Sequence, residues 1–150
     1  MKIIIASDHA GYNLKETIKE YIKTCHLQNT ETDGVEFCDI GCHNEERCNF
    51  PFYANNLCSQ LKKDTSYDFG ILICGTGIGM SIAANKNEGI RCALCHSGYE
   101  ARMARQHNNA NVLALGERVI GAGVAINIID TFLTTKFLGG RYQERMSKIV

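Results

Sequence analysis

Short apolar segments typical of β-strands alternate with longer amphipathic segments along the whole chain. The strand-like segments are Lys2–Ser7, Val35–Ile40, Phe69–Cys74, Ile90–Leu94 and Asn111–Leu115. Strands that are apolar throughout must be covered on both faces, and strands joined through helices pair in parallel with right-handed crossovers. The order of segments therefore predicts an α/β fold, a doubly wound three-layer sandwich around a five-stranded parallel sheet.

The helical segments carry their apolar residues on one face. In the first, residues 11–25, the expected buried stripe is Leu14, Ile18, Tyr21, Ile22 and Cys25, and the expected solvent-facing residues are Lys15, Glu16, Lys19, Glu20 and Lys23. Further helices are expected from about Tyr53 to Lys62, from the glycines after Cys74 to about Lys86, from Ser97 onward, and over 121–138. Gly139 and Gly140 then precede a short amphipathic C-terminal tail helix whose expected buried stripe is Tyr142, Met146 and Ile149.

Length and charge narrow the class of protein. The 150 residues fit one domain, spanning 1–150, without an internal repeat or linker. Sixteen Lys and Arg balance sixteen Asp and Glu, which gives no electrostatic reason to expect nucleic acid or a membrane surface as partner. No apolar stretch approaches the ~20 residues that span a bilayer, and the chain opens on a strand-like segment rather than a signal peptide. These features predict a cytoplasmic protein.

The eight cysteines do not form the pattern of a disulfide-stapled domain. Cys92 and Cys95 are three apart in a strand-like segment, so their side chains should point to opposite faces of the sheet and not share a zinc ion. Residues 38–48 hold three more cysteines and His43 without a standard zinc spacing. We expect reduced structural thiols and no metal, with an adventitious metal site as the alternative.

Residues 71–80 join a strand, one cysteine and three glycines that open a helix. Such a turn directs several free backbone N–H groups at one point, which favours an anion there and the thiolate form of Cys74. The turn lacks the glycine spacing of a dinucleotide site and the lysine of a P-loop, which argues against NAD and ATP as cofactors. An ordinary structural turn is the alternative.

Other polar residues follow or precede the strands. Asp8 and His9 follow the first strand, either as a helix N-cap and a solvated loop residue or as a polar pair beside Cys74. His107 ends a helix and could simply complement its dipole. Arg141 and Arg145 are four apart on the tail helix, which suits either a solvated basic face or a shared dianion such as phosphate.

Taken together, these segments resemble ribose-5-phosphate isomerase type B. The matching stretches run in order over almost the whole chain: residues 7–11, 73–79, 83–86, 89–91, 105–108, 111–113 and 139–145. The resemblance implies a Rossmann-like sandwich and an aldose–ketose isomerase that needs neither metal nor cofactor and interconverts ribose 5-phosphate and ribulose 5-phosphate. It also implies a homodimer, or a tetramer, whose active sites are built from both subunits; the apolar face of helix 121–138 suits such an interface or the core.

The resemblance also implies a role for each matching residue. Cys74 corresponds to the base that moves the proton between C2 and C1, and Thr76 assists proton transfer between the sugar oxygens. The backbone N–H groups that would stabilise the enediolate belong to the turn Gly75, Thr76, Gly77, Ile78 and Gly79. These roles are chemically reasonable, because removing a proton beside a carbonyl creates an oxyanion that fixed N–H donors stabilise.

Opening of the sugar ring falls to His107 with Asp8, and Asn108 contacts the substrate. The residues implied in phosphate binding are His9, Arg141 and Arg145, with Arg118 as a further basic residue near the site. Arginines hold phosphate with two hydrogen bonds each and so locate the reacting carbon.

Two residues depart from the pattern, and three alternative functions stay open. Phe50 stands where many relatives have tyrosine, and Tyr142 where many have histidine after the tail arginine. The alternatives are an isomerase of allose 6-phosphate or galactose 6-phosphate, a non-catalytic phosphate-binding module, and a redox role for Cys74. A binding module would need neither Cys74 nor His107, and a redox role lacks a partner cysteine nearby in sequence.

Overall fold

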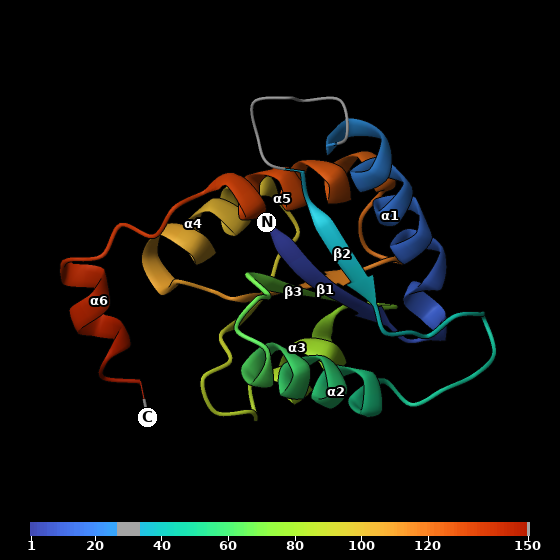
Figure 1. Ribbon diagram of the computed structural model, residues 1–150, viewed down its shortest axis with the longest axis horizontal. Helices are drawn as coiled ribbons and strands as arrows, with labels where there is room; N and C mark the ends of the chain where they lie inside the picture. Colours follow the sequence, from blue (N-terminus) through green and yellow to red (C-terminus); the bar gives the residue numbers. More distant parts are fainter. Residues whose placement is uncertain (27–33, 150) are drawn as a thin grey trace.

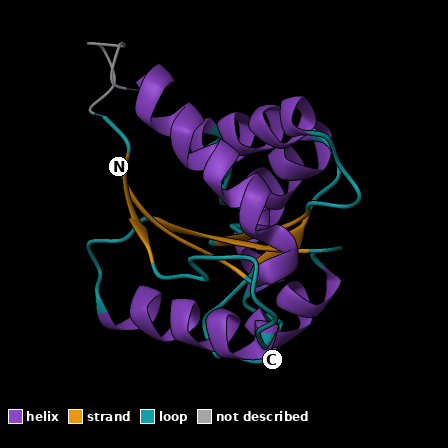
Figure 2. Cartoon of the chain, turned by 90° about the vertical axis from the view of Figure 1, so that its right-hand side faces the viewer, coloured by secondary structure: helices purple, strands orange, loops and turns teal. Residues whose placement is uncertain are grey.

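The computed structural model describes residues 1–26 and 34–149 and confirms the predicted parallel sheet between two layers of helices (Figures 1 and 2). The strands are β1 (Lys2–Ser7), β2 (Glu36–Asp39), β3 (Phe69–Cys74), β4 (Cys92–Leu94) and β5 (Val112–Gly116). Their spatial order is β2-β1-β3-β5-β4, and every neighbouring pair is parallel. The winding reverses between β1 and β3, which is the place where doubly wound sheets bind ligands.

Helices cover both faces of the sheet. They are α1 (Tyr12–His26), α2 (Phe50–Lys63), α3 (Ile78–Ala84), α4 (Gly98–Asn108), α5 (Ala122–Thr134) and α6 (Arg141–Met146), and a 3-10 turn, η1 (His9–Gly11), leads into α1. Helices α1, α4 and α5 lie on one face and α2 and α3 on the other, while α6 projects at the end of the molecule beside α4 (Figure 1).

Alternation along the strands decides which side chains meet which layer. On β1, Ile3 and Ile5 pack against α1, α4 and α5, whereas Ile4 and Ala6 pack against α2 and α3. Cys74 ends β3 on the α2–α3 side. As predicted, Cys92 and Cys95 lie on opposite faces of the sheet.

Some helix boundaries differ from those expected. Helix α2 begins at Phe50 rather than near Tyr53, because Pro51 fits the first helical turn, where no backbone N–H is needed. Helix α5 ends at Thr134 rather than 138, since Thr135 is extended and its hydroxyl bonds back to the Thr131 carbonyl. Most of the apolar face of α5 is buried in the core of the chain, while Val124 is 45% exposed.

Two expectations about single residues were wrong. Lys15, expected in solvent, is fully buried beside β2, and Ile149, expected in the core, is 68% exposed beyond the end of α6. The side chain of Cys25, assigned to the buried stripe of α1, lies outside the described residues. In the described ranges, no helix combines the length and the apolar character required to cross a bilayer.

Candidate active site

Three loops meet at the carboxyl edge of the sheet, each following a central strand. Backbone hydrogen bonds tie them together: Asp8 N–H donates to the Ile73 carbonyl (3.1 Å), and Glu117 N–H donates to the Cys74 carbonyl (3.0 Å). Arg118 N–H then donates to the Gly75 carbonyl at 2.9 Å. The loops after β1, β3 and β5 therefore form one rigid edge, as expected where the winding of the sheet reverses.

Cys74 stands at the centre of this edge with its thiol against the glycine turn. The side chain is 6% exposed, and the backbone N–H of Gly77 donates to its sulfur at 3.1 Å. A directed N–H group stabilises negative charge on sulfur, which suits a thiolate that acts as a base or nucleophile. The next N–H group, that of Ile78, donates to the Thr76 hydroxyl at 3.3 Å.

Close packing explains why the turn needs glycine. Gly77 has a φ of +77°, and a Cβ added there would lie 2.9 Å from the Leu115 carbonyl carbon. A Cβ on Gly79 would lie 2.9 Å from the ring of Phe50, so that ring lies against the first turn of α3. The turn is thus held between β5 and α2, and its N–H groups have a fixed direction.

Asp8 and Arg118 flank the same edge. Asp8 is 7% exposed, and its carboxylate accepts from the Ala10 N–H at 2.9 Å, so it is both the N-cap of η1 and part of the site. Burial raises the pKa of Asp8, and the Ala10 N–H and the charges of His9 and Arg118 oppose this only in part. A Cβ added to Gly75 would lie 3.5 Å from Arg118 Cδ, which places the arginine side chain over the start of the turn.

His9 is joined to the cysteine-rich loop, residues 38–48, which contains Cys42 and Cys48. The Cys48 N–H donates to His9 Nδ1 at 3.3 Å, and the Cys48 thiol lies 3.8 Å from the same nitrogen. With Nδ1 accepting this bond, neutral His9 carries its proton on Nε2, the nitrogen on the other side of the ring. The Cys48 thiol is also within hydrogen-bonding reach of Cys42 and Tyr53, and burial raises the pKa of Cys42.

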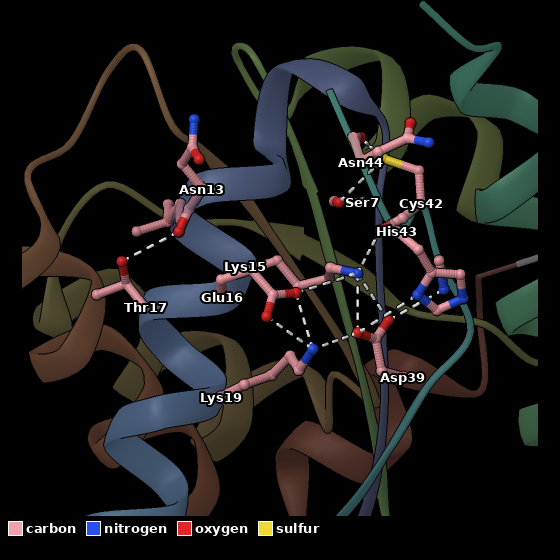
Figure 3. Close-up of polar contacts among 12 residues, drawn as sticks. Ser7, Asn13, Lys15, Glu16, Thr17, Lys19, Asp39, Cys42, His43 and Asn44 are labelled. Atoms are coloured by element: carbon pink, nitrogen blue, oxygen red, sulfur yellow. Dashed lines mark hydrogen bonds and ion pairs between the residues drawn. The ribbon is translucent and has the colours of Figure 1, made fainter. Parts of the chain in front are cut away.

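An ion network around the buried Lys15 fastens this loop to α1 (Figure 3). Lys15 Nζ donates to both oxygens of Asp39 at 2.7 and 2.9 Å and to the Cys42 carbonyl. Lys19 pairs with Asp39 at 2.6 Å and with Glu16 at 2.7 Å. Two backbone bonds between Ser7 and residues 41–42 then connect the loop directly to the end of β1. The network therefore sets where the loop lies beside Asp8 and His9.

The remaining predicted residues lie at the opposite edge of the sheet. His107 and Asn108 end α4, just before the start of β5, and Arg141 and Arg145 are exposed on α6. The length of β5, from Val112 to Gly116, is about 13 Å at ~3.3 Å per residue and separates the two edges. Within one chain, the end of α4 and helix α6 therefore lie away from the end of β3 that carries Cys74.

This second group forms its own cluster. The imidazole of His107 stacks on the ring of Tyr142, and Asn108 Nδ2 lies 3.6 Å from the sulfur of Met146. Next to the cluster, two hollows of about 600 and 480 Å³ separate α6 from residues 85–92. Within the described ranges, no three His, Cys, Asp or Glu side chains are arranged to hold a metal ion.

Three contributors at the carboxyl edge were not identified from the sequence. Glu117 accepts from the Leu14 N–H at 2.8 Å and so joins the β5 loop to the start of α1. Cys48 supports His9, and Lys15 anchors the loop. Position directly after a strand could have singled out Glu117, but no local pattern marks Lys15 or Cys48, whose partners lie far away in sequence.

Comparison with known proteins identifies the family of the chain. The sequence profile of the ribose/galactose isomerase family matches residues 3–149. Ribose-5-phosphate isomerase B of Escherichia coli is 43% identical over 148 residues, covering 99% of this chain and 93% of that protein. The structure of ribose-5-phosphate isomerase B from Clostridium thermocellum superposes with a TM-score of 0.91 at 48% identity, covering 99% and 95% of the two chains.

A third relative was solved with a sugar phosphate. Ribose-5-phosphate isomerase B from Mycoplasma genitalium with bound ribulose 5-phosphate matches with a TM-score of 0.87 and 42% identity, over 99% of this chain and 93% of that one. A profile match over almost every residue, at such identities, establishes kinship and not only a shared fold. The chain belongs to the ribose/galactose isomerase family, alongside the type B ribose-5-phosphate isomerases, and is a sugar-phosphate isomerase.

Proposed function

We propose that the chain interconverts D-ribose 5-phosphate and D-ribulose 5-phosphate through an enediolate, with Cys74 as the base. The observation that supports this most directly is the Cys74 thiol, buried at the carboxyl edge with the Gly77 N–H directed at its sulfur. The relatives named above as ribose-5-phosphate isomerase B support the choice of a five-carbon substrate.

The proposed chemistry needs no external oxidant or reductant. Starting from the open-chain aldose, the Cys74 thiolate takes the proton from C2 and later returns it to C1. The negative charge moves onto the sugar oxygens, where N–H groups of the turn from Gly75 to Gly79 stabilise it. Thr76, exposed within this turn, passes the remaining proton from one oxygen to the other.

The substrate is held by polar residues from both edges of the sheet. Asp8 assists His107 in opening the furanose ring, and Asn108 contacts the sugar. Positive charge for the phosphate comes from Arg141 and Arg145, with His9 as a further donor and Arg118 nearby. Phosphate held by arginines would align C1 and C2 with the sulfur.

Cys74 and Asp8 lie at one edge of the sheet, whereas His107 and the tail arginines lie at the other. We therefore infer that the enzyme works as a homodimer with shared active sites. A two-fold axis places the carboxyl edge of one copy against the opposite edge of its partner, and completes two equal sites. Ile78 and Ile82 on α3, next to the Cys74 turn, are 52% and 58% exposed and provide apolar surface for such a contact.

Steady-state assays test the catalytic assignment. We expect turnover of ribose 5-phosphate in EDTA, a drop of at least ~100-fold in Cys74→Ala, and no such loss in the control Cys58→Ala, whose buried thiol lies on α2. Parallel assays with allose 6-phosphate measure the preference for chain length. Substantial activity in Cys74→Ala would remove this residue from the mechanism, and greater turnover of allose 6-phosphate would reverse the choice of substrate.

Mixing two inactive variants tests the shared site. A mixed dimer of Cys74→Ala and His107→Ala chains contains one site with both residues intact. After unfolding and refolding of an equal mixture, random pairing of the chains should restore about a quarter of the wild-type activity. If both residues instead served the same site from one chain, the mixture would be no more active than its components.

A further inference from the structure

Tyr142 contacts both His107 and Arg141 at the α4–α6 edge. Its ring is stacked on the imidazole of His107, with centroids 4.1 Å apart and planes 8° apart. The two rings come from different elements, the last turn of α4 and the first turn of α6. A parallel stack of this kind restricts motion of the imidazole out of its own plane.

The other end of Tyr142 contacts the first tail arginine. Arg141 Nη2 donates to the Tyr142 hydroxyl at 2.8 Å, and the guanidinium carbon lies 4.9 Å from the centre of the tyrosine ring. Tyr142 is half-buried, whereas Arg141 is exposed. The tyrosine therefore restrains a long side chain that would otherwise sample many rotamers in solvent.

The backbone between α5 and α6 brings Tyr142 and His107 together. Gly139 and Gly140 both have positive φ, +65° and +53°, and the Leu138 N–H donates to the Gln106 carbonyl at 3.2 Å. The chain thus turns sharply after α5 and places the start of α6 on the end of α4. This arrangement holds Tyr142 over His107.

We propose that Tyr142 is a positioning residue, whose ring fixes the plane of the His107 imidazole and whose hydroxyl orients Arg141. The proposal rests on the functions proposed above for His107 in ring opening and for Arg141 in phosphate binding. Neither contact involves Cys74 or the glycine turn. The effect of Tyr142 should therefore be confined to ring opening and phosphate affinity.

The two chemical steps can be separated experimentally. Ring opening removes the proton from O1, delivers a proton to the ring oxygen O4 and breaks the C1–O4 bond, so it depends on the imidazole. Ribulose 5-phosphate is always open-chain, because its phosphate occupies O5, the oxygen that would close a five-membered ring on C2. Exchange of its C1 hydrogen with D₂O reports proton transfer by Cys74 without any ring opening.

The test compares Tyr142→Leu and Tyr142→Phe, with Tyr99→Leu as control, since Tyr99 is 69% exposed on the same helix as His107. Tyr142→Leu should lower kcat for ribose 5-phosphate about 10-fold while leaving the saturated rate of C1 exchange nearly unchanged. Tyr142→Phe keeps the stack, so kcat should stay close to wild type. Without the hydroxyl contact, KM should rise for both sugars, by about 2- to 12-fold.

Proton NMR reports the contact directly. The ring current of Tyr142 should shift the His107 ring protons upfield in the wild type and in Tyr142→Phe, but not in Tyr142→Leu. Equal loss of kcat in turnover and exchange, or an unchanged kcat in Tyr142→Leu, would overturn the positioning of His107. An unchanged KM in Tyr142→Phe would overturn that of Arg141. A wild type that shows neither turnover nor exchange would instead refute the proposed function itself.

Discussion

The ion network around Lys15, which anchors the loop beside His9, allows a quantitative prediction for the variant Lys15→Met. Lys15 is fully buried and donates to both Asp39 oxygens and to the Cys42 carbonyl. Removing one partner of a buried pair costs about 3–5 kcal/mol, because the other charge stays buried. Asp39 would keep Lys19 at 2.6 Å, which lowers the cost, but the Cys42 carbonyl would lose its donor, which adds about 1 kcal/mol or more.

We therefore expect Lys15→Met to lower the free energy of unfolding by about 3 kcal/mol, or the melting temperature by roughly 6–12 °C for a chain of this size. Urea unfolding followed by circular dichroism, at one chain concentration, measures this change. The control Lys63→Met removes an exposed lysine at the end of α2 and should change stability by less than about 0.5 kcal/mol. Equal, small losses in both variants would refute the reasoning.

The pH dependence provides a second check on the same variant. Burial raises the pKa of Asp39, but the hydrogen bonds from Lys15 and Lys19 outweigh burial, and the pKa is held below its ordinary value of 3.8. The folded chain therefore binds this proton more weakly than the unfolded chain, so the ionised carboxylate stabilises the fold above pH 3.8. This stabilisation is lost as the pH falls further. The difference in the free energy of unfolding between wild type and Lys15→Met should therefore become smaller in acid. A difference that stays constant would mean that the ion pair does not carry the effect.

Two further predictions concern the carboxyl edge. Gly77→Ala introduces a Cβ at a φ of +77° and 2.9 Å from the Leu115 backbone. It should lower the free energy of unfolding by at least about 2 kcal/mol and remove most of the activity. In the control Gly123→Ala, no atom lies within 4 Å of the added Cβ, so the substitution should stabilise α5 by about 0.5 kcal/mol. Urea titrations of both variants decide this, and equal stabilities would show that the turn is not constrained. Asp8→Asn should lower turnover but leave the urea midpoint at pH 7 unchanged or higher. Burial raises the pKa of Asp8, so the folded chain binds this proton more tightly than the unfolded chain. Ionisation of the Asp8 carboxyl therefore opposes folding above its ordinary pKa of 3.8. A lower midpoint would contradict this.

Local sequence patterns were sufficient for the sheet and for the carboxyl edge. Apolar strands such as residues 69–74 can be read from composition alone, and βα alternation leaves few topologies. Cys74 and Asp8 each follow directly on a strand, so the parallel sheet brings them to one edge without further information. The family resemblance then assigned them roles that their geometry supports.

Residues whose surroundings come from distant parts of the chain were harder to predict. Lys15 has the helical spacing of a solvent-facing residue, yet Asp39 and the Cys42 carbonyl, more than twenty positions away, bury it. A 3.6-residue period describes only a helix and its own faces; it contains no information about what packs beside them.

The sequence by itself determined the fold class, the family and the identity of the residues at the carboxyl edge, because each follows from neighbours along the chain. Only the tertiary structure decided that His107 and the tail arginines lie at the other edge, that Tyr142 joins them, and that a buried lysine holds the loop beside His9. The physical reason is that strand order and side-chain packing, rather than distance in sequence, set which groups share a site.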